Sequence, residues 1–194
     1  RARNRANHMD VLIGQTTLRR PLQLASSSPR RRSLMHWAGF DITIFSPDID
    51  ESQLENENPI DLVERLATNK IRVAPPASLT LAADTIVHRK GTIYCKPVDA
   101  EEAYTHLRAL SGNTHTVTTG VAVRVGTTIH TFHVNTDVRI RTLTDQEIQA
   151  YIESGEPFGK AGGYAIQGRG GALVAGIHGS WTNVMGLPMS ETLN

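Results

Sequence analysis

The amino-acid sequence predicts a mixed α/β fold in a single compact domain. Its 194 residues, 39% of them hydrophobic and 20% charged, are enough to bury one core, in one lobe or two. Short β-branched runs alternate with segments of helical periodicity, and no internal repeat interrupts them. No run of about eighteen apolar residues could span a bilayer, and a lone Cys95 cannot build a disulfide framework. We therefore expect a soluble, cytoplasmic protein.

The charge is unevenly distributed along the chain. Residues 1–20 contain five arginines and one aspartate, a net charge of +4, which leaves −3 of the total +1 for residues 21–194. A mildly acidic body argues against general nucleic-acid binding. Residues 1–9 lack the apolar core of a signal peptide, and His8-Met9 resembles a cloning junction. We therefore treat residues 1–20 as a basic N-terminal extension, part of it a possible tag, and residues 21–194 as one domain.

Caps and breakers predict the first elements. Residues 22–25 are a short apolar strand, and Ser28-Pro29 then offers an N-cap and a proline suited to the first helical position. That helix should end at Gly39, where a left-handed conformation stops it. Residues 40–45 alternate as a second strand. Asn58-Pro59 begins a second helix, whose apolar residues form one stripe.

The middle of the chain predicts a buried central strand and a long hairpin. Pro75-Pro76 ends the second helix. Residues 79–87 are nearly continuous in apolar and β-branched residues, as in a strand covered on both faces. Residues 116–125 and 128–138 have the composition of two long strands, which we expect to join near Gly126.

Two further helices and a glycine-rich segment complete the predicted elements. Asp99 with Glu102, and Thr144 with Glu147, have the spacing of capping boxes at helix starts. Residues 155–179 contain nine glycines, which indicates a backbone that closely approaches a ligand or itself.

The segment Ser-Ser-Ser-Pro-Arg-Arg-Arg at residues 26–32 has the features of an anion site. It lies between a predicted strand and a predicted helix, where serine hydroxyls, free N–H groups and the positive end of the helix dipole converge. The arginines add forked donors for phosphate oxygens. In the alternative interpretation, Ser28 only caps the helix and the arginines form a solvated face.

Asp84 is a single carboxylate that closes the apolar run 79–83. At a strand end in an α/β sheet it would lie where ligands bind. Burying an unpaired carboxylate costs much free energy, so we expect a cation or a metal beside it. Alternatively, it caps a turn with Thr85. The Asp50-Glu51 pair after the second strand could supply an oxygen ligand for Mg²⁺, or could form an ordinary solvated turn.

The chain has only four lysines, which are Lys70, Lys90, Lys96 and Lys160. Each by itself could be a surface charge, and only the neighbouring anion site suggests a role for Lys70 and Lys96. Phosphate-binding P-loops, zinc motifs of the H-E-x-x-H or paired C-x-x-C type, and the G-x-S-x-G nucleophile motif are all absent from the sequence.

Several stretches of sequence, in order over residues 21–193, resemble the Maf family of nucleoside triphosphate pyrophosphatases. They are LQLASSSPRRRSLMHWAG, LVERLATNK, LAADTIV, the lysine-proline pair, LSGNTHTVTTGVAV, GKAGGYAIQG and GSWTNVMGLP. The resemblance implies an elongated mixed sheet flanked by helices, in two lobes with a central cleft, similar to the inosine triphosphate pyrophosphatases. The final helix expected after Pro188 is cut short at Asn194.

The resemblance also implies an activity, which is cleavage of a nucleoside triphosphate to the monophosphate and pyrophosphate. It implies a divalent metal, Mg²⁺ or Mn²⁺, and a homodimer. The hydropathy and charge described above predict no membrane and no specific nucleic acid among its partners. The positions that match the family's functional residues are Asp84 as catalytic base, Ser26, Arg30, Lys70 and Lys96 for phosphate, Glu51 with Asp84 for metal, and Arg31, Thr85 and Gln167 for specificity. The last three match the branch that prefers dTTP and UTP.

These matches predict water attack at the α-phosphorus with Asp84 as general base. Two other functions remain open. The chain could be a nucleotide-binding regulator of cell division without hydrolysis, or a pyrophosphatase for a modified nucleotide such as 7-methyl-GTP. A glutamine amide could pair with the imide edge of uracil or thymine, but guanine offers a similar edge.

Overall fold

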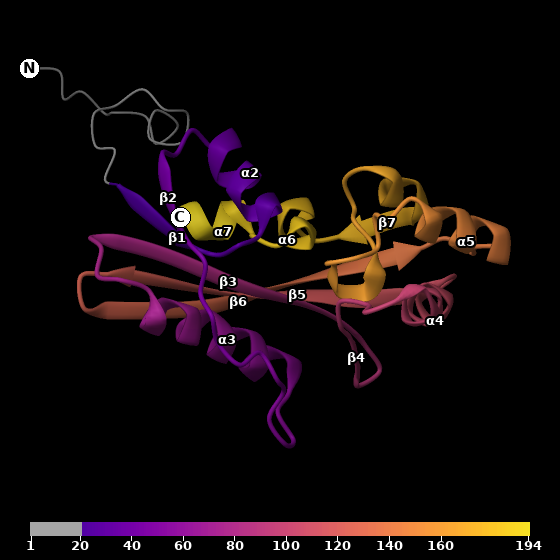
Figure 1. The fold of residues 1–194 in the computed structure, drawn as a ribbon, viewed down its shortest axis with the longest axis horizontal. Coiled ribbons are helices and arrows are strands. Elements are labelled where there is room, and N and C mark those ends of the chain that lie inside the picture. The colour runs from indigo at the N-terminus through magenta and orange to yellow at the C-terminus, as the bar shows by residue number, and fades with distance from the viewer. Residues whose placement is uncertain (1–20) are drawn as a thin grey trace, which may run out of the picture.

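The computed structural model describes residues 21–194, which form an open, seven-stranded mixed sheet with helices on both faces (Figure 1). The mixed α/β prediction is confirmed, while the predicted basic extension, residues 1–20, lies outside the described residues. The strands are β1 (Leu22–Ala25), β2 (Ile42–Phe45), β3 (Leu79–Arg89), β4 (Thr92–Tyr94), β5 (Thr114–Val125), β6 (Thr128–Ile140) and β7 (Val174–His178). Their order is β2-β1-β3-β5-β6-β7, and β4 pairs with β3.

The helices cover the sheet in two groups. They are α2 (Pro29–Trp37), α3 (Pro59–Val73), α4 (Ala100–Leu110), α5 (Asp145–Glu153), α6 (Trp181–Met185) and α7 (Met189–Leu193), with two 3₁₀ turns, η1 (Ala161–Gly163) and η2 (Arg169–Leu173). Figure 1 shows α3 on one face of β3, β5 and β6, and α2, α6 and α7 on the other. Within residues 21–194, no helix has the length and apolar character needed to cross a bilayer.

Strand register opens a gap beside the central strand β3. β5 pairs with β3 from Leu79 to His88 along one edge. On the other edge β1 pairs with residues 79–81 only, and β4 pairs with residues 87–89. Residues 82–86 of β3 therefore lack a strand on that side. The gap opens directly beyond the carboxyl end of β1, where parallel strands of α/β sheets bind ligands.

The helix caps form largely as the sequence predicts. Ser28 Oγ accepts a hydrogen bond from Arg31 N (3.4 Å), and the Thr144 side chain forms a complete capping box with Glu147. The predicted box at Asp99 is only half right. Asp99 accepts from Glu102 N (2.8 Å), but the Glu102 carboxylate bonds to Val98 N (2.8 Å) instead of the Asp99 amide. The carboxylate thus binds the chain one residue before the cap.

The hydrophobic core is divided between the two ends of the long strands. At one end, Leu24, Met35 and Leu187 pack between β1, α2 and the C-terminal helices, with α3 covering the opposite face of the sheet. At the other end, a second cluster around Leu107 and Ile148 packs α4 and α5 against β5 and β6. The two lobes of the predicted fold correspond to these two cores, and the gap beside β3 lies between them.

The sequence missed two strands and misplaced one residue. β4 has only three residues, and β7 lies inside the glycine-rich segment, where pairing with β6 defines it. Asp84 was expected at a strand end, but β3 continues beyond it to Arg89. Asp84 nevertheless borders the gap beside β3, because the neighbouring strand β1 ends before this position. The short helix after Pro188 is present as α7.

Candidate active site

A cavity of about 520 Å³ lies at the gap beside β3, and residues from both lobes line it. Its lining includes all nine residues to which the family resemblance assigns a role, which are Ser26, Arg30, Arg31, Glu51, Lys70, Asp84, Thr85, Lys96 and Gln167. These residues come from α2, α3, β3 and four loops, the first of which directly follows β1. Residues spread over more than 140 positions of the sequence are therefore brought to one site.

On the α3 side of the cavity, Lys70 joins two carboxylates. Lys70 Nζ lies 2.5 Å from Asp84 Oδ1 and 2.7 Å from Glu51 Oε1. Lys70 and Asp84 are buried, whereas the Glu51 side chain is 45% exposed. The Lys70 ammonium holds the pKa of Glu51 below its ordinary value, against the desolvation that raises it. The alternative of a surface lysine at position 70 is wrong, because helix α3 directs it into the site.

On the α2 side, the buried guanidinium of Arg31 is held by three oxygens. Its Nε donates to Gly186 O (2.6 Å), Nη1 to Ser26 Oγ (3.2 Å) and Nη2 to Thr85 Oγ1 (2.9 Å). Burial lowers the pKa of Arg31, while Asp84 and Glu51 oppose that shift. The alternative in which Asp84 caps a turn with Thr85 is wrong, since Thr85 belongs to this arginine network and Asp84 to Lys70.

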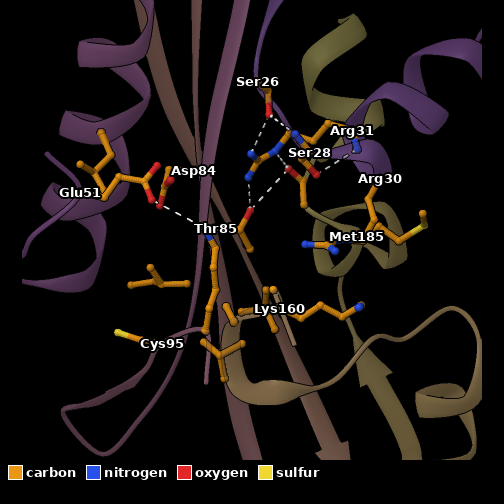
Figure 2. Close-up of a pocket in the computed structure, with 18 of the residues that line it drawn as sticks. Ser26, Ser28, Arg30, Arg31, Glu51, Asp84, Thr85, Cys95, Lys160 and Met185 are labelled. Atoms are coloured by element: carbon orange, nitrogen blue, oxygen red, sulfur yellow. Dashed lines mark hydrogen bonds and ion pairs between the residues drawn. The ribbon is translucent and has the colours of Figure 1, made fainter. Parts of the chain in front are cut away.

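Arg30 and Lys160 face the cavity away from the two carboxylates (Figure 2). Among residues 21–194, neither forms a salt bridge with a carboxylate. Burial lowers the pKa of both, and the charge of Arg30 lowers the pKa of Lys160 further. Two partly desolvated like charges repel one another, and an anion between them would relieve that repulsion. Ser28 does cap α2, as the alternative interpretation of residues 26–32 requires. The rest of that interpretation is wrong, because Arg30 and Arg31 line the cavity and do not form a solvated face.

The remaining predicted residues lie at the rim or wall of the cavity. The Lys96 side chain is 61% exposed, with Nζ 3.7 Å from Glu51 Oε2. Gln167 is half-buried in the glycine-rich loop. Asp50, by contrast, accepts a hydrogen bond from Ser52 N (2.9 Å) within its own turn and does not line the cavity. Of the predicted acidic pair, only Glu51 reaches the site.

Sequence reasoning gave Lys160 no role, although it lines the cavity. Its Nζ donates to Glu156 O (2.6 Å), so the loop folds the lysine back over its own turn. The signal that could have identified Lys160 is its position in the segment of nine glycines. A glycine-rich backbone can approach a ligand closely, and it then brings its few polar side chains to that ligand. The glycines themselves serve backbone contact: a Cβ on Gly170 would lie 2.3 Å from Ala165 O.

The acidic side of the cavity has the donor chemistry that a divalent cation needs. Mg²⁺ binds one or two carboxylates together with substrate phosphates and water. Asp84 and Glu51 already converge on a single cation, the Lys70 ammonium. Within residues 21–194, no group of three or more His, Cys, Asp or Glu residues could enclose a metal by itself. The two carboxylates therefore fit a cation whose other ligands come from a bound phosphate and water.

Fold and cavity together define an α/β protein that can bind a phosphorylated ligand between a pair of carboxylates and a set of cations. Residues 21–194 match the family described as Maf-like protein. The chain belongs to the Maf family. Its relatives include proteins named dTTP/UTP pyrophosphatase from Symbiobacterium thermophilum, 45% identical over 175 residues (89% of this chain, 90% of the relative), and from Pseudoalteromonas translucida, 48% identical over 174 residues (87% and 92%).

Proposed function

We propose that this protein hydrolyses dTTP and UTP to the nucleoside monophosphate and pyrophosphate. The observation that carries the proposal is the arrangement of one cavity, with Asp84 and Glu51 on one side and Arg30 and Lys160 on the other (Figure 2). Relatives at 44–48% identity are named dTTP/UTP pyrophosphatase, which supports this reaction and these two bases. The acidic side would hold the α-phosphate, where the reaction takes place, and the cationic side would stabilise the negative charge of the departing pyrophosphate.

Asp84 is the proposed general base. Its carboxylate would take a proton from the water whose oxygen attacks the α-phosphorus, as the bond from that phosphorus to the bridging oxygen breaks. Lys70 holds Asp84 Oδ1 at 2.5 Å and so fixes the direction of the carboxylate. A divalent cation held by Asp84 and Glu51 would supply Lewis-acid stabilisation of the phosphate oxygens.

The cations have different proposed tasks. Lys70 is already neutralised by two carboxylates, so its first role is to orient them. Ser26, Arg30 and Lys96 bind phosphate oxygens, and Lys160 adds a further charge for the departing pyrophosphate. Because phosphoryl transfer depends mainly on positioning and electrostatics, this distribution of charge is the main contribution of the protein.

Base selection is assigned to Gln167, supported by Arg31 and Thr85. The glutamine amide offers one acceptor and one donor, which match N3–H and O4 of uracil or thymine. Arg31 uses three of its five N–H donors on Ser26, Thr85 and Gly186, so its main proposed role is to shape the wall of the cavity. The relatives' names support the pyrimidine preference.

A substrate panel tests the proposal directly. Purified protein is incubated with Mg²⁺ or Mn²⁺ and dTTP, UTP, CTP, GTP or 7-methyl-GTP, and pyrophosphate and monophosphate are quantified. We expect equal amounts of both products, with dTTP and UTP cleaved fastest. Nucleotide binding without pyrophosphate release would instead support a regulator, and fastest cleavage of 7-methyl-GTP would support the modified-nucleotide alternative. A homodimer, which the resemblance implies, and a cytoplasmic location, which the lone cysteine and the lack of a long apolar run predict, belong to the same proposal. They are tested by sedimentation and by fractionation of cells.

A further inference from the structure

Glu156 lies outside the cavity, yet it joins both ends of the loop that lines it. Its carboxylate accepts hydrogen bonds from two consecutive amides of η2, Arg169 N (3.1 Å, to Oε1) and Gly170 N (2.7 Å, to Oε2). Its main-chain oxygen accepts from Lys160 Nζ (2.6 Å). One residue thus holds the loop at its beginning, through Lys160, and at its end, through η2.

We call these contacts of Glu156 with Lys160, Arg169 and Gly170 the clamp. A further contact, made by Tyr151, extends the clamp into the middle of the loop. The buried hydroxyl of Tyr151 accepts a hydrogen bond from Ala165 N (3.1 Å). Burial raises the pKa of the Glu156 carboxyl, and the nearby Tyr151 hydroxyl helps to hold that pKa below its ordinary value. The three amides that are held, at residues 165, 169 and 170, flank Gln167 on both sides. Within residues 21–194 the Gln167 side chain forms no hydrogen bond, so its place in the cavity depends on the backbone that carries it.

Close packing leaves this backbone little freedom as long as the clamp is present. A Cβ on Gly168 would lie 2.4 Å from Glu156 Oε1, and a Cβ on Gly170 would lie 2.6 Å from the Tyr151 hydroxyl oxygen. Gly168 also has φ = +85°, which other residues rarely adopt. The loop therefore encloses the carboxylate tightly, and a charged acceptor bonded to successive amides is a strong, directional restraint.

We propose that Glu156 is a positioning residue for base recognition, which acts through Gln167 by holding the loop of residues 157–170 against the cavity. This inference rests on the proposed function, because it assigns Gln167 to the base. Glu156 touches no substrate atom in this assignment. Loss of its carboxylate should therefore loosen the fit of the base and leave the reacting groups, Asp84 and Lys70, in place.

The variant Glu156→Gln tests the proposal, with Tyr151→Phe as a milder second variant and Glu153→Gln as the matched control. Glu153 is the last residue of α5, the helix that carries Tyr151. It is exposed and bonds only to Gln149 within the part of the chain described (3.4 Å). For Glu156→Gln we expect KM for UTP to rise about tenfold with kcat changed less than about threefold. The preference for UTP over GTP should fall by a similar factor, and Glu153→Gln should match the wild type.

A double variant separates positioning from general destabilisation. If Glu156 acts through Gln167, then adding Glu156→Gln to Gln167→Ala should cost less than about twofold in kcat/KM for UTP. Hydrogen exchange of the amides at 165–171 should also accelerate in Glu156→Gln and not in Glu153→Gln. Independent, multiplying losses in the double variant, or an unchanged base preference in both Glu156→Gln and Tyr151→Phe, would overturn the inference. A wild type that cleaves no nucleoside triphosphate would overturn the proposed function, whereas slow amide exchange in Glu156→Gln would overturn the clamp itself.

Discussion

Asp84 and Thr85 are consecutive residues of β3, and their side chains engage opposite faces of the sheet. Asp84 Oδ1 lies 2.5 Å from Lys70 Nζ of α3, whereas Thr85 Oγ1 accepts a hydrogen bond from Arg31 Nη2 of α2 (2.9 Å). Both still line one cavity, because β1 ends before this point and leaves the edge of β3 open. The proposed proton acceptor and one wall of the binding site are thus fixed by neighbouring positions of a single strand.

Replacing Asp84 with asparagine removes the proton acceptor and keeps the side-chain volume. We expect release of pyrophosphate from UTP to fall by about a hundredfold or more, the usual size of a general-base contribution. Binding of a non-hydrolysable UTP analogue, measured by calorimetry, should persist, because the cations on the opposite side remain. Turnover at the wild-type rate would refute the assignment of Asp84 as base.

Lys160→Gln removes a cation that has no carboxylate salt bridge within residues 21–194. Inhibition by added pyrophosphate should weaken by about tenfold, since a charge-assisted hydrogen bond to phosphate is lost. The control is Lys90→Gln, because Lys90 is exposed on the turn between β3 and β4. Equal pyrophosphate inhibition in Lys160→Gln and wild type would show that this lysine binds no phosphate.

His115 should make stability depend on pH between about 4 and 6.5. The ring is buried, with Nε2 2.8 Å from the Tyr164 hydroxyl oxygen, and burial lowers its pKa from 6.5 to about 4. In this range the unfolded chain binds the proton more strongly, so the free energy of unfolding falls as the pH falls. The stabilisation is complete above pH 6.5 and is lost as the pH approaches 4.

The variant His115→Asn isolates this contribution from the other histidines. Its deficit in unfolding free energy relative to wild type should narrow by about 2 kcal/mol between pH 7 and pH 4.5. Urea unfolding at the two pH values measures the change. Parallel pH profiles for the two proteins would show that His115 does not titrate with a lowered pKa.

Gly120→Ala tests the contact that places Lys70 in the site. A Cβ at position 120 would lie 2.4 Å from the carbonyl carbon of Val63, in the backbone of α3. The helix would have to move away from β5, and we expect a loss of about 3 kcal/mol in unfolding free energy and reduced hydrolysis. Gly176→Ala is the control, since its Cβ would meet only Arg139 Nη2 at 3.6 Å. Similar melting temperatures for the two variants would contradict the close packing of α3.

Local signals predicted most of the elements. Ser28, Asn58 and Thr144 cap helices because a side-chain oxygen next to free amides acts within a few residues. β7 was missed because it is only five residues long and lies inside the glycine-rich segment 155–179, and its hydrogen bonds go to β6, some forty residues away. The Glu102 carboxylate was assigned to the wrong amide, since the choice between neighbouring N–H groups depends on the bend of the preceding chain.

The chain itself specified the residue types of the candidate site: a carboxylate in an apolar run, a serine-arginine segment before a helix, and scarce lysines near both. Their mutual positions were decided by contacts across the fold. Helix α3 turns Lys70 to its buried face, but no local pattern specifies that Asp84 and Glu51 meet it there, or that Arg30 lies near Lys160. Those approaches arise from strand register, from the early end of β1 and from the fit of α3 on Gly120, which are long-range packing relations that no local pattern encodes.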